Sequence, residues 1–506
     1  MKFLESRPRR GRARSATDRS ETRPLPELVA CCLDKLKNSG VLDHALNSPI
    51  YHDSWQEAGI DPAQVRTYSD FIRIPFMTSG HLRAVLADTA PADLAGDTDV
   101  RFWISTSGTT GKPKWIPVGE GDIANIMAAA KRMLSMAADP GEDLSFLALG
   151  APAPFASESW IYLAFAVFFR ENRATNSAMF TLPELMDALY FARKLKSRTM
   201  YAFPSIAVLI GENVAQRAAG EAALLFRKKK NLRNFLAMAA TRVIHVKARH
   251  VFRFRKGLFA GEPVPPYAKA LKQSFNLEAF AAYGSTESAH VAIIECDRHQ
   301  GMHVFLDTCL PEIIPEAELE RERDDPAYRP HAIPLWEAQH GLSGELVLTT
   351  FAEAFPLVRH RISDLVRVEG TTPCACGRTH PRISILHRSD DIISLGLIRF
   401  SIYLLKSKLE AVSINGRIGQ WRLRLTREGV KPKMLLEVRS ERPAAEAALR
   451  REILERIDEI EGVRQARENG LIAAPEIRFV EEISDTRGQS GKDRLVTYEP
   501  AYFSGD

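Results

Sequence analysis

The chain has 506 residues, 45% of them hydrophobic, and its 68 basic and 63 acidic side chains give a formal net charge of +5. This length and apolar content exclude a fibrous or wholly disordered protein and predict two or three folded domains. No apolar run reaches the roughly 18 residues of a membrane span, and six cysteines in so long a chain do not indicate a disulfide framework. We therefore expect a cytoplasmic protein without a membrane span.

The first 24 residues are rich in arginine and lack apolar periodicity. Residues 2–23 contain eight Lys or Arg and three Asp or Glu, so the rest of the chain is close to neutral. A secretory signal is excluded because no apolar stretch follows the charges, and the acidic residues are unusual for a transit peptide. We expect a disordered basic tail over 1–24. Contact with nucleic acid or a membrane surface is the less favoured interpretation, and no nucleic-acid partner is expected.

Helical and strand patterns alternate between residues 25 and 256. Helices are predicted for LPELVACCLDKL, with Cys31 and Cys32 in the core, and for GDIANIMAAAKRMLSMA and LPELMDALYFARKL, while LSFLALG and MYAFPS are predicted strands. This alternation predicts an α/β fold with helices packed on sheets. The basic stretch Arg227–Lys256 is interpreted as a helix and a strand with solvated basic faces. A site for the anionic tail of a ligand is the alternative.

One loop in this region has the composition of a phosphate-binding segment. STSGTTGKPK, Ser105–Lys114, crowds hydroxyls, glycines and lysines directly after an apolar run. Glycines let the backbone approach an anion, while N–H, O–H and ammonium groups bind its oxygens. The P-loop of NTPases is excluded, because the glycine spacing is too short and a proline follows Lys112. A polar linker between two strands is the alternative.

The pattern changes after Gly341. GELVLTT and DLVRVEG alternate like strands, and PCACGRTHPRI is rich in turn residues. Beyond residue 391 we expect a helix (SIYLLKSKLEAV), a hairpin (QWRLRLTREGVKPKMLLEVRS), a second helix (AAEAALRREILERIDEI) and a strand (EIRFVEEI). About 115 residues of this α+β pattern suffice for an independent domain. The expected organisation is a large N-terminal α/β domain of packed sheets and helices over 25–388, a boundary at 389–391 and a smaller α+β domain over 392–506.

Five motifs follow one another in order. After STSGTTGKPK come FAGEP (259–263), AAYGSTES (281–288), PLVRHRISDLVRV (356–368) and GQSGKDRLV (488–496). The series resembles that of the adenylate-forming superfamily of acyl-CoA synthetases and adenylation domains. SPIYHDSWQEAGIDP, PFMTSGHLR, PEIIP, GELVLTTFAEAFPLVRHRISD, CACGRTHPRI and RSDDII look, more closely, like the phenylacetate-CoA ligase branch.

The resemblance implies an ATP-dependent ligase that forms acyl-AMP, releases pyrophosphate and passes the acyl group to a thiol. Lys492, Thr286 and Glu287 would be catalytic: Lys492 would neutralise the reacting anions, Thr286 would reach the α-phosphate and Glu287 would hold Mg²⁺. The implied nucleotide-binding residues are Ser107, Gly108, Thr109, Thr110, Gly111, Lys114, Gly261, Glu262, Pro263, Tyr283, Gly284, Asp364 and Arg388.

Within this set the resemblance also implies individual roles. The glycine-containing loop would hold the β- and γ-phosphates, with Thr109, Thr110 and Lys114 as contacts. Tyr283 would stack on adenine, and Asp364 would accept the two ribose hydroxyls. Asp390 would be the hinge about which the smaller, mobile domain rotates between adenylation and thioester formation.

The cysteines and histidines outside these motifs form a separate pattern. CDRHQGMH and PCACGRTH place Cys/His pairs on two loops, which suggests a structural Zn²⁺ site of Cys296, His303, Cys374 and Cys376, with His380 the rival fourth ligand. Similar residues recur in the phenylacetate-CoA ligase branch. Cys-x-Cys is tighter than the usual spacing, so plain turn cysteines are the alternative.

The departures from the family pattern concern the second half-reaction. Arg359–Asp364, RHRISD, keeps the arginines and carboxylate of the family's RYRTGD, but DDIISLGLIRFSIYLLK after the hinge is one residue shorter, with Ile398 where asparagine is usual. We expect activation of an aryl or arylalkyl acid and transfer to CoA. Transfer to an amine or a carrier-protein thiol, and a nucleotide-binding protein without turnover, are the alternatives.

The acid itself is not specified by the sequence. Its pocket is expected near 151–160, 203–205 and 281–283, where small and apolar residues could surround an aryl group. The sequence leaves the oligomeric state, homodimer included, open.

Overall fold

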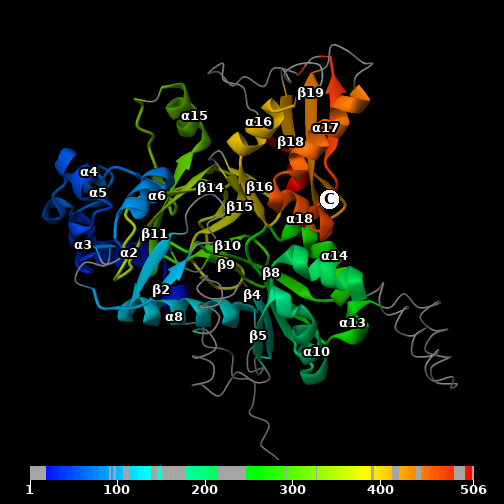
Figure 1. Ribbon diagram of the computed structural model, residues 1–506. Coiled ribbons are helices and arrows are strands. Elements are labelled where there is room, and N and C mark those ends of the chain that lie inside the picture. The colour runs from blue at the N-terminus through cyan, green and yellow to red at the C-terminus, as the bar shows by residue number, and fades with distance from the viewer. Residues whose placement is uncertain are drawn as a thin grey trace, which may run out of the picture.

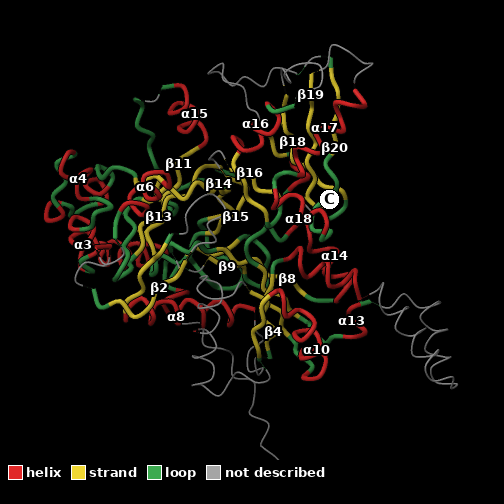
Figure 2. The backbone as a smooth tube through the Cα atoms, viewed as in Figure 1, coloured by secondary structure: helices red, strands yellow, loops and turns green. Residues whose placement is uncertain are grey.

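The computed structural model describes residues 19–503 without 91–92, 95–97, 106–113, 138–144, 151–162, 164–176, 215–246, 289, 292, 326, 389–391, 413–420, 440–445, 482 and 484–495. In this part the fold is α/β, as predicted. A large twisted sheet runs through the centre with helices around it, and a smaller unit lies beside its upper edge (Figure 1; Figure 2).

The described residues form a 13-stranded sheet in which twelve strands follow one another and β1 pairs with β14. One half is parallel: β8 (Glu278–Tyr283), β7 (Lys256–Phe259), β6 (Thr199–Ala202), β4 (Phe146–Gly150) and β5 (Ala178–Thr181). The other half is antiparallel except at β1: β12 (Ile333–Pro334), β11 (Cys309–Pro315), β13 (Ser343–Thr350), β14 (His360–Gly370), β15 (Arg382–Arg388), β10 (Met302–Val304), β9 (Ile293–Glu295) and β1 (Met77–Thr78). β8 and β9 join the halves, at the point where strand direction changes.

Helices cover both faces of the parallel half. On one face α8 (Glu120–Ala137) packs Ala130, Met133 and Leu134 against strand residues such as Phe146 and Phe280. On the other face lie η2 (Leu182–Glu184), α10 (Leu185–Leu195), a helix over 204–214, α13 (Ala248–Val251) and α14 (Pro265–Phe275). The strands are therefore apolar on both sides, which is what a sheet covered on both faces requires.

The N-terminal helices pack around the antiparallel half and the hairpin of β2 (Val100–Ser105) and β3 (Trp115–Gly119). They are α1 (Arg19–Thr22), α2 (Leu25–Asn38), α3 (Val41–Asn47), α4 (His52–Glu57), η1 (Pro62–Gln64), α5 (Tyr68–Phe71) and α6 (Ser79–Asp88), while α15 (Glu316–Asp324) follows β11. In α2, Leu28, Cys32 and Leu36 are buried at a spacing of four residues. Cys31 points away from that stripe and is exposed, so its predicted place in the core is wrong.

The residues from Arg19 on, which were expected to belong to a disordered tail over 1–24, are ordered. Residues 1–18 lie outside the described part, but Arg19–Thr22 forms α1 and Glu21 is buried. The Glu21 carboxylate bonds to Arg132 Nε at 3.0 Å and to Arg378 Nε at 2.6 Å. Two arginines far apart in sequence therefore order this segment, which local composition could not reveal.

The C-terminal unit has its own core, drawn from residues 393–502. Its elements are β16 (Ile392–Leu395), β17 (Ile398–Ser401), α16 (Ile402–Glu410), β18 (Trp421–Glu428), β19 (Lys431–Arg439), α17 (Glu446–Asp458), α18 (Glu461–Glu468), β20 (Glu476–Val480), β21 (Val496–Tyr498) and η4 (Pro500–Tyr502). Strands β20, β19, β18 and β21 form one sheet. The predicted helices, hairpin and strand of this region are all present.

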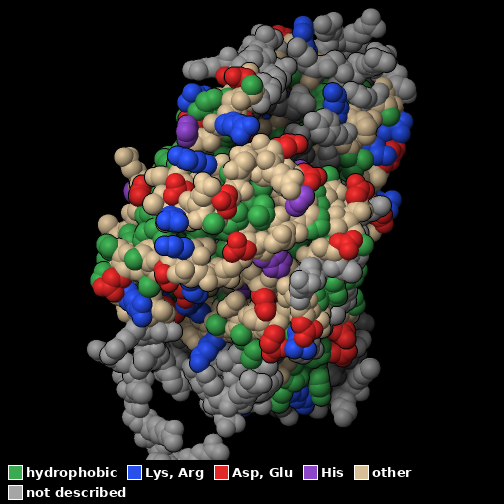
Figure 3. All heavy atoms as spheres, turned by 90° about the vertical axis from the view of Figure 1, so that its left-hand side faces the viewer, with side chains coloured by type: hydrophobic (Ala, Val, Ile, Leu, Met, Phe, Trp, Pro, Cys, Tyr) green, Lys and Arg blue, Asp and Glu red, His purple; other side chains and the backbone are tan. Residues whose placement is uncertain are grey.

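The face over the N-terminal helices carries acidic and basic side chains intermixed (Figure 3). This agrees with the nearly neutral charge of the chain beyond its basic first residues. Among the described residues no helix is both long and apolar enough to cross a bilayer.

Candidate active site

A cavity of about 1400 Å³ opens at the carboxyl ends of β7 and β8, against β14 and the C-terminal unit. Ligands of open α/β sheets bind at this edge of the parallel strands. Its lining includes these residues expected at a nucleotide site: Lys114, Gly261, Glu262, Pro263, Tyr283, Gly284, Thr286, Glu287 and Asp364. Segments from four parts of the sequence therefore meet in one cavity.

Tyr283 and Asp364 are in direct contact. The Tyr283 hydroxyl, at the end of β8, donates to Asp364 Oδ2 at 2.6 Å. Asp364 lies in β14 where the register with β15 shifts, and the preceding Ser363 has a φ of 66°. Such an irregularity turns a side chain away from the regular pleat. The pairing leaves an aromatic ring and a carboxylate side by side in the wall of the cavity, which suits a base and a ribose.

Lys114 and Glu287 form an ion pair inside the cavity. Lys114 directly precedes β3, and Glu287 lies in the turn after β8. Burial by itself raises the pKa of Glu287, but the charge and hydrogen bond of Lys114 outweigh it and lower the pKa to about 2. Protonated His360 would act in the same direction. The Glu287 carboxylate is therefore charged at neutral pH and suited to a hard cation.

The Gly261–Pro263 segment follows β7 and forms another part of the wall. Gly261 has a φ of 85°, and a Cβ there would lie 2.5 Å from the Phe203 ring, so only glycine fits. The Glu262 carboxylate accepts hydrogen bonds from Ser205 N at 3.2 Å and from the Tyr267 hydroxyl at 3.0 Å. Its pKa is raised by burial. Glu262 is thus committed to contacts within the protein that hold the segment in place.

Several expected residues fall outside the described part. These are Ser107, Gly108, Thr109, Thr110, Gly111, the hinge residue Asp390, the lysine Lys492 and the pocket stretch 151–160. Residues 106–113 connect β2 to β3, whose ends pair at Ser105 and Trp115, so the expected phosphate loop closes a hairpin. Lys114, at its end, lines the cavity. Arg388 lies opposite Asp364 in the β14–β15 register, and its side chain is outside the description.

Sequence reasoning did not single out Arg427. It lines the cavity from β18 of the C-terminal unit, and its guanidinium lies 4.7 Å from the Tyr267 ring centroid and 5.0 Å from that of Tyr502. Its Nε donates to Tyr502 O at 2.7 Å. A single arginine in a strand of alternating pattern belongs to no motif. Its place in the cavity becomes visible only in the structure, where the C-terminal unit packs against α14.

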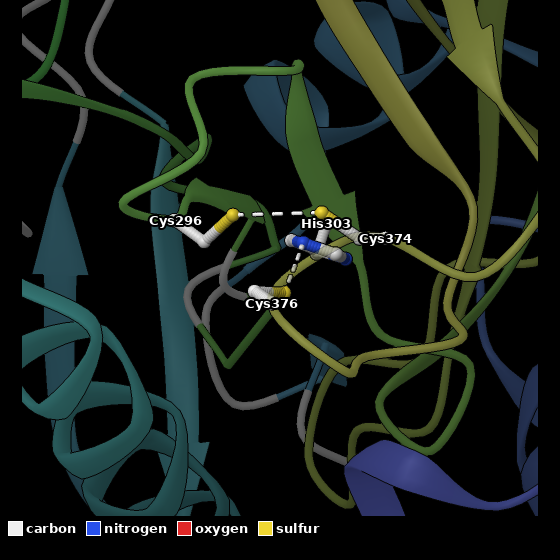
Figure 4. A group of neighbouring side chains, drawn as sticks. All are labelled: Cys296, His303, Cys374 and Cys376. Carbon is white, nitrogen blue, oxygen red and sulfur yellow. Dashed lines mark hydrogen bonds between the residues drawn. The ribbon is translucent and has the colours of Figure 1, made fainter.

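The expected metal ligands converge at a second place. The ligand atoms of Cys296, His303, Cys374 and Cys376 all lie within 4.8 Å of one another, and their side chains point inward in Figure 4. Cys296 Sγ is 3.8 Å from Cys374 Sγ, and Cys376 Sγ is 3.5 Å from His303 Nε2. The rival His380 is not in this group: its Nδ1 accepts a hydrogen bond from Leu306 N at 3.2 Å.

Comparisons with known proteins agree with this geometry. The family model described as "AMP-binding enzyme" matches residues 33–312. Phenylacetate-coenzyme A ligase of Escherichia coli is 26% identical over 386 residues, covering 74% of each chain, and that of Thermus thermophilus is 24% identical over 437 residues, covering 84% of each.

Solved structures show the same fold. 2-Hydroxyisobutyryl-CoA ligase with 2-HIB-AMP and CoA in the thioesterification state aligns with a TM-score of 0.63 at 23% identity, covering 96% of this chain and 92% of that one. In the postadenylation state with 2-HIB-AMP, the same enzyme aligns with a TM-score of 0.56 at 22% identity and equal coverage.

Proposed function

Because the chain belongs to the AMP-binding enzyme family, we propose that it is an ATP-dependent carboxylic acid–CoA ligase. It activates an acid as acyl-AMP with release of pyrophosphate and then transfers the acyl group to CoA. The observation that carries this function is the convergence of Lys114, Tyr283, Glu287 and Asp364 on one cavity. Relatives that are phenylacetate-CoA ligases support an aryl or arylalkyl acid as substrate.

In the first half-reaction a carboxylate oxygen attacks the α-phosphorus of ATP, and pyrophosphate leaves. Tyr283 would hold adenine by stacking, and Asp364 would accept the ribose hydroxyls. Lys114 would move from Glu287 to the phosphate oxygens, where positive charge is needed as the two anions approach. Glu287 would hold Mg²⁺, which when bound supplies further positive charge to those oxygens. Thr286 would donate to the α-phosphate, and Lys492 would contact the reacting carboxylate.

In the second half-reaction the CoA thiol attacks the acyl carbon, and AMP leaves. We propose that the C-terminal unit turns about Asp390, so that Lys492 leaves the site and the thiol can enter. Support for a unit that docks in more than one position comes from 2-hydroxyisobutyryl-CoA ligase, which aligns with this chain and has been solved in both a postadenylation and a thioesterification state. The short β16–β17 hairpin, with Gly396 in its turn near Glu262, would then line the path of the thiol.

We also propose that the cysteine cluster holds a structural Zn²⁺. Tetrahedral bonds of about 2.3 Å to sulfur and about 2.0 Å to nitrogen place two sulfurs about 3.8 Å apart, and a sulfur and a nitrogen about 3.5 Å apart. The two separations reported above agree with these values. Zinc, when bound, would join the β9–β10 turn to the loop between β14 and β15. All four positions are taken by protein, which suits a structural and not a catalytic ion.

The proposal is tested with purified protein, ATP, Mg²⁺ and a panel of aryl, arylacetic and fatty acids, with and without CoA, reading AMP, pyrophosphate and acyl products by mass. An acyl-CoA that forms only when CoA is present is the expected result. Lys492→Ala should lower adenylation by several orders of magnitude, because it removes a charge contact made in the transition state. Lys408→Ala, which loses an ion pair to Glu459 within the C-terminal unit, is the matched control.

Other outcomes would contradict parts of the proposal. AMP formation without a CoA adduct would reassign the acceptor to an amine or a carrier-protein thiol, as the altered segment after the hinge allows. ATP binding without turnover on any acid, equal in Lys492→Ala and in the unaltered protein, would instead leave a nucleotide-binding protein.

A further inference from the structure

A second cavity, of about 500 Å³, shares no lining residue with the catalytic one and is strongly basic. Its lining consists of Lys196, Arg198, Arg249, His250, Phe252, Arg253, Arg255, Phe275 and Asn276. No acidic residue occurs among these described lining residues. Three of the cations, Arg249, Arg253 and Arg255, belong to the basic stretch Arg227–Lys256. The proposed ligase chemistry does not use this stretch.

The basic residues and the catalytic residues lie at opposite ends of the same strands, although the large cavity extends to Leu277 and Glu278, next to Asn276. Arg198 directly precedes β6, Arg255 directly precedes β7, and Asn276 precedes β8. The catalytic residues follow the same strands, at Gly261 and Tyr283. Since β6, β7 and β8 are parallel, the basic cavity lies at the opposite edge of the sheet. In Figure 1 α10 and α13 are correspondingly at the lower right, on the far side of α14 from α18.

Helix ends explain part of this charge. α10 ends at Leu195 with Lys196 as its cap, and α14 ends at Phe275 with Asn276 as its cap. Each carboxyl terminus contributes a partial charge of about −0.5, so two such ends supply about −1. Cations at these ends would be expected even without a ligand.

The number of cations exceeds what the helix ends need. Arg198 and Arg255 also have other interactions, so their charges are already engaged within the protein. Lys196, Arg249 and Arg253 alone then bring +3, which leaves an excess of about two positive charges. These groups are exposed and line an open hollow whose volume is in the range of small-molecule sites. Two excess charges in a hollow match one doubly charged phosphate group.

We propose that this cavity binds the phosphate group of a small phosphorylated molecule that is neither ATP nor CoA of the ligase reaction. Arg249 and Arg253 hold the phosphate oxygens through their forked guanidinium groups, and Lys196 adds a point charge. His250, whose Nδ1 accepts a hydrogen bond from Lys247 N at 3.1 Å, would donate through Nε2.

The probe is inorganic pyrophosphate, titrated calorimetrically into the full chain. The catalytic cavity, where pyrophosphate is a product, serves as the internal reference. We expect two binding events, of which the Arg249→Ala/Arg253→Ala variant weakens one at least tenfold and leaves the other unchanged. Arg249→Lys/Arg253→Lys, which keeps the charge but loses the paired guanidinium hydrogen bonds, should bind more tightly than the alanine variant and more weakly than the unaltered chain. Circular dichroism of both variants confirms that they are folded.

Two results would overturn the assignment. If both variants and the unaltered chain give the same titration, the cations only complement the helix ends. If the alanine variant raises the KM for CoA, the cavity belongs to the ligase reaction and is not a separate site. A loss of pyrophosphate binding with KM for CoA unchanged is the expected pair of observations, and it does not depend on which acid the ligase uses.

Discussion

Asp364 is positioned within the protein before any ligand arrives. Its Oδ2 accepts the Tyr283 hydroxyl at 2.6 Å, and the proposed ribose contact would use the same carboxylate. A group that needs no reorientation loses less entropy when it binds. Under the proposed function, the hydroxyl of Tyr283 would therefore act on ATP affinity indirectly, through the orientation of Asp364, while its ring would contact the base.

Tyr283→Phe tests this arrangement. The ring is kept and the hydrogen bond to a charged group is lost, so we expect the Kd for ATP to rise by about tenfold, equivalent to about 1.4 kcal/mol. Tyr68→Phe is the matched control, because it removes a hydroxyl that donates to Glu312 at 3.0 Å outside the cavity. The measurement is equilibrium titration with ATP and Mg²⁺. Equal affinities in both variants would refute a role for the Tyr283 hydroxyl.

His380 makes a different kind of contribution, to stability. Burial lowers its pKa from 6.5 to about 4, and its Nδ1 already accepts the Leu306 N–H. The folded state therefore prefers the neutral ring. Stability that is present above pH 6.5 is lost as the pH falls from 6.5 toward 4, because the unfolded chain gains the proton first.

Replacing His380 with glutamine should remove this pH dependence. Glutamine still offers an acceptor to Leu306 N and does not titrate. At pH 5 the unaltered protein should have lost about 2 kcal/mol through this residue relative to pH 7.5, and the variant should lose correspondingly less. Urea unfolding at both pH values measures the difference. His331→Gln, at an exposed histidine, should behave like the unaltered chain; an identical pH response in the His380 variant would exclude this account.

At the scale of elements, the cysteine cluster brings the β9–β10 turn next to the loop between β14 and β15. β9 and β10 have only three residues each, and Cys374 and Cys376 lie in the loop between the longer β14 and β15. A bound ion there would fix the β9–β10 turn against that loop. It would also stabilise the strand next to β8, whose carboxyl end carries Tyr283.

Metal analysis and metal removal test this role. We expect about one zinc per chain by elemental analysis, and a thermal midpoint at least about 5 °C lower after chelation, because the ion binds the folded state alone. Cys376→Ser should lose the zinc and show the same lowered midpoint. Cys31→Ser, at an exposed cysteine outside the cluster, should keep the bound zinc and the thermal midpoint of the unaltered protein. A full complement of zinc in Cys376→Ser would contradict the assigned ligands.

Elements were more predictable than the contacts between them. α8, β4, β13 and the β18–β19 hairpin follow from periodicity, and Tyr283, Glu287 and Asp364 follow from motifs that lie in or just beyond strands. The sequence favoured His303 over His380, but the strand pairing that places His303 at the cysteines, opposite Arg382, is visible only in the structure. The burial of Glu21 likewise depends on Arg132 and Arg378, which are distant in sequence.

At the scale of the whole molecule, Arg427 connects the two units. It is anchored in the C-terminal unit by bonds to Tyr502 O and Val430 O, and its guanidinium lies against the Tyr267 ring of α14. Tyr267 in turn donates to Glu262 in the cavity wall. If the C-terminal unit turns between the two half-reactions, this contact exists in one position of the unit and is broken in the other.

Arg427→Ala should therefore separate the two half-reactions. If the docked position seen here serves thioester formation, loss of a contact worth about 1 kcal/mol shifts the units away from it, and thioester formation should slow by roughly threefold to tenfold. Acid-dependent exchange of pyrophosphate into ATP, which reports adenylation alone, should be unchanged or faster. Arg424→Ala is the matched control, since Arg424 bonds to Glu437 and Glu499 within the C-terminal unit. An equal loss of both half-reactions in Arg427→Ala would mean that the arginine serves the cavity directly and does not bias the position of the unit.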